Sequence, residues 1–232
     1  MKDMITPLLE VIALDATDAR HARDGGADRL ELVSDMAAAG LSPAPSTVAA
    51  VRAATDLPVR VMLRTRADFT AGDLGPLRRT AKDLRAAGAT EFVLGFLTPA
   101  ATVDLPAVLE LLAVLDGAPW TFHRAIDHTT DRPAAWAALT GLPGLDAVLT
   151  SGAPAGLRDG LAALLAEAPA RPALLAGGGL RHEHIALLRA AGVTAFHSGT
   201  AVREAGAWTG PVDPALVHDL KLTLGRAPTG RP

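Results

Sequence analysis

The chain has 232 residues, a net charge of −3, a mean hydropathy of +0.25 and no cysteine. The negative charge, together with five Phe, three Trp and no Tyr, argues against nucleic acid as a partner, because phosphate backbones bind basic surfaces and unpaired bases stack on aromatic rings. Without cysteine the chain has no disulfide, no thiolate nucleophile and no thiolate metal ligand.

The first residues, MKDMITPLLEV, contain no long apolar stretch behind a basic leader, and charged residues interrupt every later apolar run before it reaches the length of a bilayer. We therefore expect a cytoplasmic protein with no membrane partner. Hydrophobic residues make up 49% of the chain, which is enough for a large core. We expect a single domain over residues 1–225, followed by a flexible C-terminal tail over residues 226–232.

Short segments rich in Val, Leu, Ile and Phe alternate along the chain with longer stretches rich in Ala, Leu and Arg. The first kind is typical of buried strands and the second of helices. We expect eight strands, at residues 8–13, 28–33, 58–64, 91–97, 119–124, 146–151, 172–177 and 194–199. Regular alternation indicates a parallel sheet with crossover helices, and eight similar units favour a single-domain α/β fold, the (β/α)8 TIM-type barrel.

Local signals support this order of elements. Asp104 stands before Leu-Pro and Asp131 before Arg-Pro, the pattern of a helix N-cap followed by proline in the first turn. The segments LRAAGATEFVLG (84–95) and LRAAGVTAFHSG (188–199) repeat one frame, in which a glycine ends a helix directly before a strand. Such a glycine suits a left-handed C-cap, so the repeat favours two similar half-barrels over chance in an alanine-rich chain.

Charged residues alternate with aliphatic ones inside several of these strands. Glu10, Glu31 and Arg60 each stand between two aliphatic residues. Successive side chains of a strand point to opposite faces, so these charges should point into the barrel. An unpaired buried charge costs roughly several kcal/mol, so each needs a partner, water or a ligand. For Arg29 and Arg60, early in their strands, we favour an ion-pair network that fills the barrel floor; for charges nearer the strand ends we favour a functional site.

Functional groups of such barrels gather at the carboxyl ends of the strands. Proton transfer is expected from His123 working with Glu10 or Glu31, because an imidazole titrates near neutral pH. His123 would equally suit a metal ligand or a core hydrogen bond, and these alternatives stay open. Ligand contacts are expected from Arg64, Arg66, Arg124, Asp127, Thr150, Ser151, Gly177, Gly178, Gly179, His197 and Ser198.

The segment AGGGL (176–180) follows the seventh expected strand and precedes a helix. Three glycines in succession expose backbone N–H groups, and in these barrels a phosphate often binds between the loops after strands seven and eight. The segment HSGTAV (197–202) would form the other wall, and arginines 64, 66 and 124 would complement a negative charge. We therefore expect a site for a small anionic ligand, although the glycines alone would also permit a tight turn.

In this order the segments LLEV, GGADRLELVSD, AGLSPAP, PVRVMLRTRADF, TFHRAID, LTSG, AGGG and FHSG resemble the CutC family over roughly residues 7–200. Residues that match the family's pattern are Glu10, Glu31, Arg64, Arg66, His123, Arg124, Asp127, Ser151 and Gly177 to Gly179. The resemblance implies a TIM-type barrel, a cytoplasmic location, a homo-oligomer such as a dimer, and a role in copper homeostasis.

Two departures from the family bear on copper. Family members often carry cysteines where this chain has Ile12 and Val33, and the family's GGDF-like turn is reduced here to Ala67-Asp68-Phe69. Cu(I) prefers thiolate and thioether ligands, and the only sulfurs here belong to four methionines. Copper as a cofactor thus follows from the resemblance alone, and the sequence identifies no metal ligand set.

Three functions remain in view. The first is copper homeostasis, either with copper held by His123 or His197 and carboxylates, or without bound metal. The second is an enzyme that acts on a small anionic or phosphorylated metabolite at the mouth of the barrel. The third is a non-catalytic scaffold, which would leave the inward charges fully paired and the mouth closed.

Overall fold

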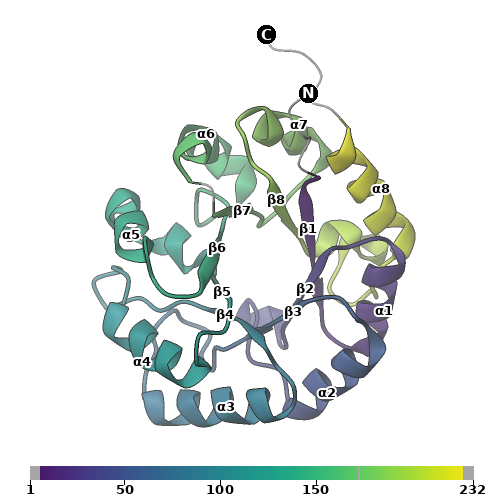
Figure 1. Cartoon of the computed structure of the whole chain (residues 1–232). Helices are drawn as coiled ribbons and strands as arrows, with labels where there is room; N and C mark the ends of the chain where they lie inside the picture. Colours follow the sequence, from purple (N-terminus) through teal and green to yellow (C-terminus); the bar gives the residue numbers. More distant parts are fainter. Residues whose placement is uncertain (1–5, 172, 227–232) are drawn as a thin grey trace.

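The computed structural model of the protein describes residues 6–171 and 173–226. Its strands form one closed barrel in chain order, in which the last strand pairs with the first (Figure 1). All ladders of the barrel are parallel, so the carboxyl ends of all strands lie at one end. The strands are β1 (Leu8–Ala13), β2 (Arg29–Leu32), β3 (Val59–Met62), β4 (Glu91–Leu94), β5 (Trp120–Phe122), β6 (Leu145–Thr150), β7 (Leu174–Ala176) and β8 (Ala195–Ser198). The expected (β/α)8 barrel is confirmed.

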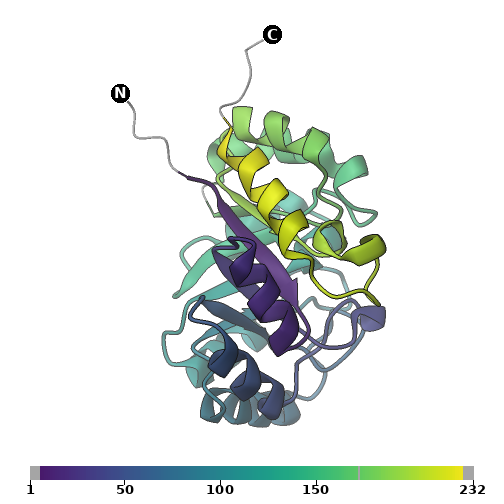
Figure 2. The ribbon, with the colours of Figure 1, turned by 90° about the vertical axis from the view of Figure 1, so that its right-hand side faces the viewer.

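A ring of helices surrounds the strands, one after each strand (Figure 1). They are α1 (Ala16–Asp24), α2 (Pro45–Ala54), α3 (Leu74–Ala86), α4 (Leu105–Leu115), α5 (Arg132–Leu139), α6 (Leu157–Glu167), α7 (His182–Ala190) and α8 (Pro214–Gly225). Short 3₁₀ helices occupy several loops: η1 (Met36–Ala38), η2 (Arg124–His128), η3 (Ala168–Ala170), η4 (Thr200–Val202) and η5 (Glu204–Gly206). Seen from the side, α8 lies next to α1, as the closure of β8 on β1 requires (Figure 2).

The local signals of the sequence have the expected structural roles. The carboxylate of Asp104 accepts a hydrogen bond from the amide of Ala107, and that of Asp131 accepts one from Ala134, so both acids cap helices. Gly88 and Gly192 follow α3 and α7 with φ of +101° and +98°. This left-handed conformation favours glycine and turns the chain from helix into strand.

Most strands are shorter than expected because the ladder ends where the chain turns into the loops at the mouth. The fourth strand ends at Leu94, and the following residues form an isolated antiparallel bridge between Leu97 and Val103. Arg64 likewise lies just beyond β3. Several residues expected at strand ends therefore belong to loops.

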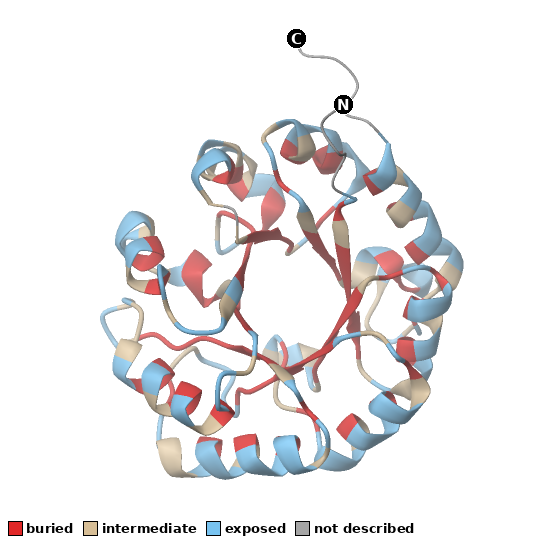
Figure 3. Ribbon diagram, viewed as in Figure 1, coloured by how far each residue is buried: buried red, intermediate tan, exposed pale blue. Residues whose placement is uncertain are grey.

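The core lies between the strands and the helices. Leu9 and Val11 point outward from β1 and are fully buried, while Glu10 between them points inward. Figure 3 shows buried residues along the strands and on the inner faces of the helices, with exposed residues on the outer faces. Burying each such aliphatic side chain stabilises the fold by about 1.5–3 kcal/mol.

Inward charges fill the floor of the barrel, as expected. The guanidinium of Arg60 is 1% exposed and binds the carboxylates of Glu91 and Asp146 and the hydroxyl of Thr121. Its Nη2 lies 2.6 Å from Oδ2 of Asp146, and its Nε lies 3.2 Å from Oε2 of Glu91. The amino ends of the strands are thus closed by ion pairs, which leaves the other end for a site.

Within the described ranges, no helix has the length and apolar character needed to cross a membrane. The last described residue, Arg226, directly follows α8. The tail expected at residues 226–232 otherwise lies outside the described residues.

Candidate functional site

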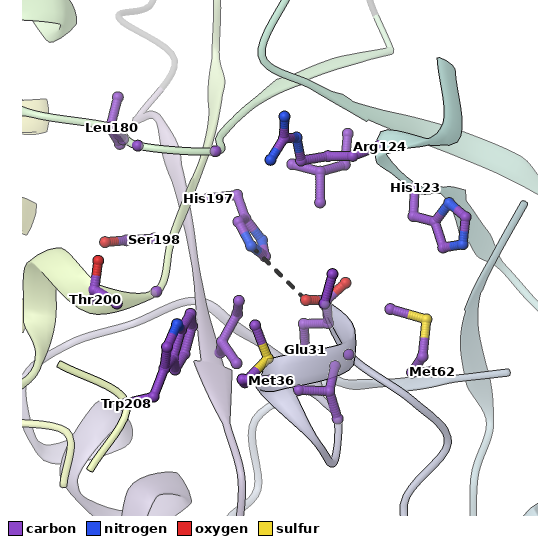
Figure 4. Close-up of a pocket in the computed structure, with 18 of the residues that line it drawn as sticks. Glu31, Met36, Met62, His123, Arg124, Leu180, His197, Ser198, Thr200 and Trp208 are labelled. Atoms are coloured by element: carbon purple, nitrogen blue, oxygen red, sulfur yellow. Dashed lines mark ion pairs between the residues drawn. The ribbon is translucent and has the colours of Figure 1, made fainter. Parts of the chain in front are cut away.

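A cavity of about 430 Å³ opens at the carboxyl ends of the strands (Figure 4). Of the residues expected at a site, it is lined by Glu31, Arg64, His123, Arg124, Gly178, Gly179, His197 and Ser198. Glu10, Arg66, Asp127, Thr150, Ser151 and Gly177 are not part of its wall. Segments from β2, β3, β5, β7 and β8 therefore meet at one cavity, and the mouth of the barrel is open rather than closed as in a scaffold.

An imidazole links the two inward glutamates, and it is that of His197 rather than His123. Nδ1 of His197 lies 2.8 Å from Oε1 of Glu10, and its Nε2 lies 3.7 Å from Oε2 of Glu31 (Figure 4). Glu10 also accepts a hydrogen bond of 2.6 Å from Nε of Arg29. The expected pairing of His123 with Glu10 is therefore not seen. Neighbouring strands explain the result, because β8 and β2 flank β1.

The two glutamates differ in charge state because their surroundings differ. Burial alone would raise the pKa of Glu10, but Arg29 and His197 outweigh it and hold that pKa far below 4.5. Burial raises the pKa of Glu31 to about 7, opposed in part by His197 and reinforced by the charge of Glu10. Oε1 of Glu31 is buried and has no hydrogen-bond partner among the described residues. Glu31 thus faces the cavity with a carboxyl group that can gain or lose a proton near neutral pH.

His123 lies at the cavity as a neutral ring. Its Nδ1 accepts a hydrogen bond of 3.2 Å from the amide of Ala125, which places the ring proton on Nε2. Burial, with a further contribution from the charge of Arg64, lowers the pKa of His123 to about 3. Nε2 is buried and has no partner in the described part of the chain. Gly95 packs directly under the ring, since a Cβ there would lie 2.7 Å from Nδ1.

Arg124 is held at the cavity wall by a buried carboxylate. Its Nε lies 3.0 Å from Oδ2 of Asp127, and its Nη2 lies 2.9 Å from Oγ of Ser151. Asp127 also accepts hydrogen bonds from the hydroxyls of Thr150 and Ser151 and from Arg132. Asp127, Thr150 and Ser151, which the sequence suggests as ligand contacts, therefore lie behind Arg124 and fix its position.

Arg64, expected to complement an anion, is instead occupied by the protein backbone. Its guanidinium donates hydrogen bonds to the carbonyl groups of residues 38–40 and 67–68. It also lies over the ring of Phe69, 4.8 Å from the centroid. Arg64 thus joins the loops after β2 and β3, and Arg124 is the arginine of the wall that is better placed for an anion.

Arg66 and Gly177 do not line the cavity as expected, whereas Ser198 does. Arg66 points away from the cavity, with a side chain that is 53% exposed and paired with Asp68. Gly177 has a packing role, because a Cβ there would lie 2.7 Å from Leu149 and 2.8 Å from His197. Ser198 lines the wall, but its side chain lies on the opposite side of β8 from His197 (Figure 4).

Backbone segments at the ends of β7 and β8 form part of the cavity wall. Residues 178–180 and 199–201 all line the cavity, and their N–H groups have no hydrogen-bond acceptor within the described chain. Gly178 has a φ of +81°, and a Cβ there would lie 2.9 Å from Nε of Arg124. Free amides beside an arginine form a site for an oxyanion. The sequence predicts both parts of this wall, through AGGGL (176–180) and HSGTAV (197–202).

Beside residues 199–201 the wall is apolar, which the sequence did not predict. Ile12, Val33 and Met62 form a small buried cluster, and Met36 and Trp208 pack against it. Trp208 closes over Gly199, where a Cβ would lie 2.5 Å from the indole. Nothing in the sequence around Trp208 marks it as a site residue, because its loop reaches the cavity only through tertiary folding.

The cavity offers no set of His, Cys, Asp or Glu side chains for a copper ion, and Met36 and Met62 are the only sulfur-bearing residues in its described wall. Among the described residues, no group of three or more His, Cys, Asp or Glu is placed to hold a metal. The imidazole of His197 is occupied by two carboxylates, and Nδ1 of His123 by a backbone amide. A thiolate set is excluded because the chain has no cysteine.

Comparison with known proteins identifies the family. The CutC family model matches residues 7–202. The chain belongs to the CutC family. A CutC family protein from Xanthomonas campestris pv. campestris is 37% identical over 217 residues, covering 90% of this chain and 86% of the relative. The human copper homeostasis protein cutC homolog is 34% identical over 208 residues, covering 86% and 76%.

Solved structures agree on the fold of this CutC-family chain. The structure described as the putative copper homeostasis protein CutC from Streptococcus agalactiae has a TM-score of 0.74 at 24% identity, covering 84% of this chain and 98% of that one. A putative phosphonomutase from Burkholderia cenocepacia has a TM-score of 0.59 at 21% identity, covering 83% and 87%. The matched CutC region includes Glu31, His123 and the free amides, whereas Trp208 lies beyond it.

Proposed function

We propose that this CutC-family protein acts in copper homeostasis, the role given in the name of its human relative, and does so as an enzyme on a small anionic molecule rather than by holding Cu(I). The observation that supports this most is the wall of free amides at residues 178–180 and 199–201, with Arg124 beside it and Glu31 in the same cavity. An anion in this place would accept hydrogen bonds from the amides and from Nη1 of Arg124, which has no acceptor in the described part of the chain.

The anionic group fits the loops after β7 and β8 better than any other part of the cavity. Arg64 already donates to five carbonyl groups, whereas the contacts of Arg124 involve its Nε and Nη2. A phosphoryl group suits this wall because it offers several oxygen acceptors to converging donors. The remaining part of the molecule would lie toward Glu31 and the apolar cluster of Ile12, Val33 and Met62.

The anion site can be tested with inorganic phosphate as the probe. We expect phosphate to raise the melting temperature of the protein more than chloride at equal ionic strength, because only phosphate binds the native cavity. The variant Arg124→Met should lose most of this protection. Arg158→Met is the matched control, because Arg158 is 89% exposed and does not line the cavity. Equal protection in both variants would refute the site.

The copper part of the proposal has a separate test. Purified protein is titrated with Cu(I) and with Cu(II) beside a variant in which His123 and His197 are both replaced by asparagine. We expect no difference in affinity between the two proteins, because neither imidazole belongs to a metal-holding group. Binding that is tight in the wild type and lost in the variant would restore the direct metal function.

We also propose a cytoplasmic location and a small homo-oligomer such as a dimer, with no nucleic-acid partner. The absence of cysteine and the net charge of −3 support the first and the last of these. Light scattering after size exclusion gives the oligomeric state, and a monomer at micromolar concentration would contradict the dimer.

A further inference from the structure

We infer that Glu31 moves a proton to and from a carbon atom next to a carbonyl group of a phosphorylated substrate, while Nε2–H of His123 donates a hydrogen bond to that carbonyl oxygen. The inference rests on the proposed function, because it needs the anion site to orient the substrate. It goes further in naming the reaction class and the substrate class. Both residues line the same cavity, at the ends of β2 and β5.

Other polar groups in the wall narrow the chemistry. The chain has no cysteine, and no lysine lines the described cavity, so neither a thiolate nucleophile nor an imine with a carbonyl substrate is available. The hydroxyl of Ser198 has no hydrogen-bond partner in the described chain, so no base activates it as a nucleophile. Proton transfer by Glu31 is the reaction that the groups in the wall support.

Glu31 is built for proton exchange by its neighbours. On the side of β8, Nε2 of His197 lies 3.7 Å from Oε2, and Glu10 of β1 holds the other ring nitrogen at 2.8 Å. The cations that face Glu31 besides His197 are Arg29 of β2 and Arg60 of β3. His197 thus supports the ionised form, while burial and the charge of Glu10 support the protonated form. A carboxyl group balanced in this way serves as base and as acid in turn.

His123 is the neutral partner that such a reaction needs. Because its Nδ1 accepts from the amide of Ala125, its one ring proton points away from that amide on Nε2. A neutral imidazole donates a hydrogen bond to an oxygen that gains negative charge without first giving up its proton. The ring is packed between Gly95, Phe69 and Phe122, so its orientation is fixed.

The proton balance of the step is complete within the cavity. The carboxylate of Glu31 takes a proton from the carbon, and the electron pair of that C–H bond forms a C=C bond. The π electrons of the carbonyl group move to its oxygen, where the hydrogen bond from His123 stabilises the enolate. If the carbon that lost its proton carries a hydroxyl group, the hydroxyl proton passes to the former carbonyl oxygen and the C=O bond re-forms at the hydroxyl-bearing carbon. Glu31 then delivers its proton to the former carbonyl carbon, which gives an isomer. No oxidant, reductant or second substrate is required.

The apolar part of the wall favours the same step. Ile12, Val33 and Met62 are at most 7% exposed, and Trp208 packs against them. Excluding water from this side strengthens the hydrogen bond to the enolate and protects the intermediate from stray protons.

Two phosphate esters separate binding from chemistry. Phosphoglycolohydroxamate mimics a planar enolate that carries a phosphate, and glycerol 3-phosphate carries the same group on a saturated chain. We expect calorimetry to show wild-type protein binding the hydroxamate about tenfold or more tightly than glycerol 3-phosphate. Glu31→Gln keeps the shape of the side chain, and His123→Asn keeps an acceptor for the amide of Ala125. Each variant should lose the preference and still bind glycerol 3-phosphate.

The outcomes distinguish the inference from the proposed function. If the wild type binds both esters equally, or if Glu31→Gln keeps the full preference, the enolate chemistry is wrong and the anion site stands. If neither ester binds the wild type or protects it against heat, the anion site is wrong and the inference falls with it. Melting curves of both variants show that each is folded before its affinities are compared.

Discussion

Nδ1 of His197 lies 2.8 Å from Oε1 of Glu10, although the two residues are 187 positions apart in the sequence. The pairing of β8 with β1 puts them side by side, because Glu10 and His197 are partners in the register of that ladder. The imidazole reaches Glu31 on its other side, so one histidine spans two acids from strands that are not its sequence neighbours. The closure of β8 on β1 therefore brings together the three groups, Glu10, Glu31 and His197, whose charges set one another's pKa values.

Glu31 should titrate near neutral pH. Burial raises its pKa to about 7, so the carboxyl group is half protonated there instead of near 4.5. In protein labelled with ¹³C at the glutamate carboxyl carbons, one resonance should move with a midpoint near this value and be missing in Glu31→Gln. A midpoint near 4.5 for that resonance would show that the cavity does not perturb Glu31.

The variant Glu31→Gln should gain stability relative to the wild type as pH rises. The pKa of Glu31 is higher in the folded than in the unfolded state, so the wild type loses free energy of unfolding as pH rises from about 4.5 to 7. The pKa of His197 is also raised, since Glu31 and Glu10 outweigh burial, and its contribution is lost with rising pH in the same sense. Glutamine at position 31 removes the pH dependence that comes from the Glu31 carboxyl group. It also weakens the one that comes from His197, because His197 loses a charged partner.

Urea unfolding at several pH values measures this effect. The free energy of unfolding of the variant minus that of the wild type should increase between about pH 4.5 and pH 7, with a slope of at most about 1.4 kcal/mol per pH unit for each proton involved. Glu183→Gln is the control, because it makes the same substitution at a side chain that is 70% exposed. A flat difference for Glu31→Gln would contradict the burial of its charge.

Arg60→Met should be destabilising. Arg60 is 1% exposed and binds the buried hydroxyl of Thr121 and the carboxylates of Glu91 and Asp146, whose side chains are 22% and 51% exposed, so its removal leaves the barrel floor without its cation. Because solvent screens the two acids, we expect a cost of about 1–3 kcal/mol, below that of a fully buried pair. The matched control is Arg78→Met, whose ion pair with Glu110 is exposed and contributes about 0–1 kcal/mol. Similar melting temperatures for the two variants would mean that the floor network adds little stability.

Ser151→Ala should weaken phosphate binding although Ser151 does not line the cavity. Its hydroxyl donates to Asp127 at 2.7 Å and accepts from Nη2 of Arg124 at 2.9 Å, so its loss frees the arginine to move. We expect a loss of about 1–2 kcal/mol in stability and a smaller shift of the melting temperature by phosphate. The exposed Ser46 gives the control variant Ser46→Ala. If phosphate raises the melting temperature of Ser151→Ala as much as that of the wild type, the hydroxyl of Ser151 is not needed to hold Arg124 in place.

The architecture follows from the sequence because its signals are local. Alternation of β-branched and alanine-rich segments predicts all eight strands, and Asp104 and Asp131 mark helix starts through hydrogen bonds to amides three residues away. The inward direction of Glu10, Glu31 and Arg60 follows from the two-residue period of a strand. The predicted strand ends were less accurate than the predicted strand order. The strand ladder stops where the loops at the mouth form hydrogen bonds within themselves or with other loops.

The hydrogen-bond and ion-pair partners of the site residues could not be predicted from such local signals. Alternation places Arg64 near the mouth, but only the folded loop of residues 38–40 decides that its charge is used by carbonyl groups. Asp127 looks like a ligand contact in the sequence because nothing there shows that Thr150 and Ser151 enclose it. Trp208 gives no sequence signal, since its loop joins the cavity through contact with Gly199.

The dependence of the charge network on the last strand also concerns how the protein is made. A growing chain that has been synthesised only through β7 carries the carboxylates of Glu10 and Glu31 without the imidazole that joins them. Arg29 still pairs with Glu10, but Glu31 faces the charge of Glu10 without its own imidazole partner, which disfavours early burial of that side of the barrel. Arrival of His197 removes this penalty, so the site would be completed late in synthesis, together with the seam between the first and last strands.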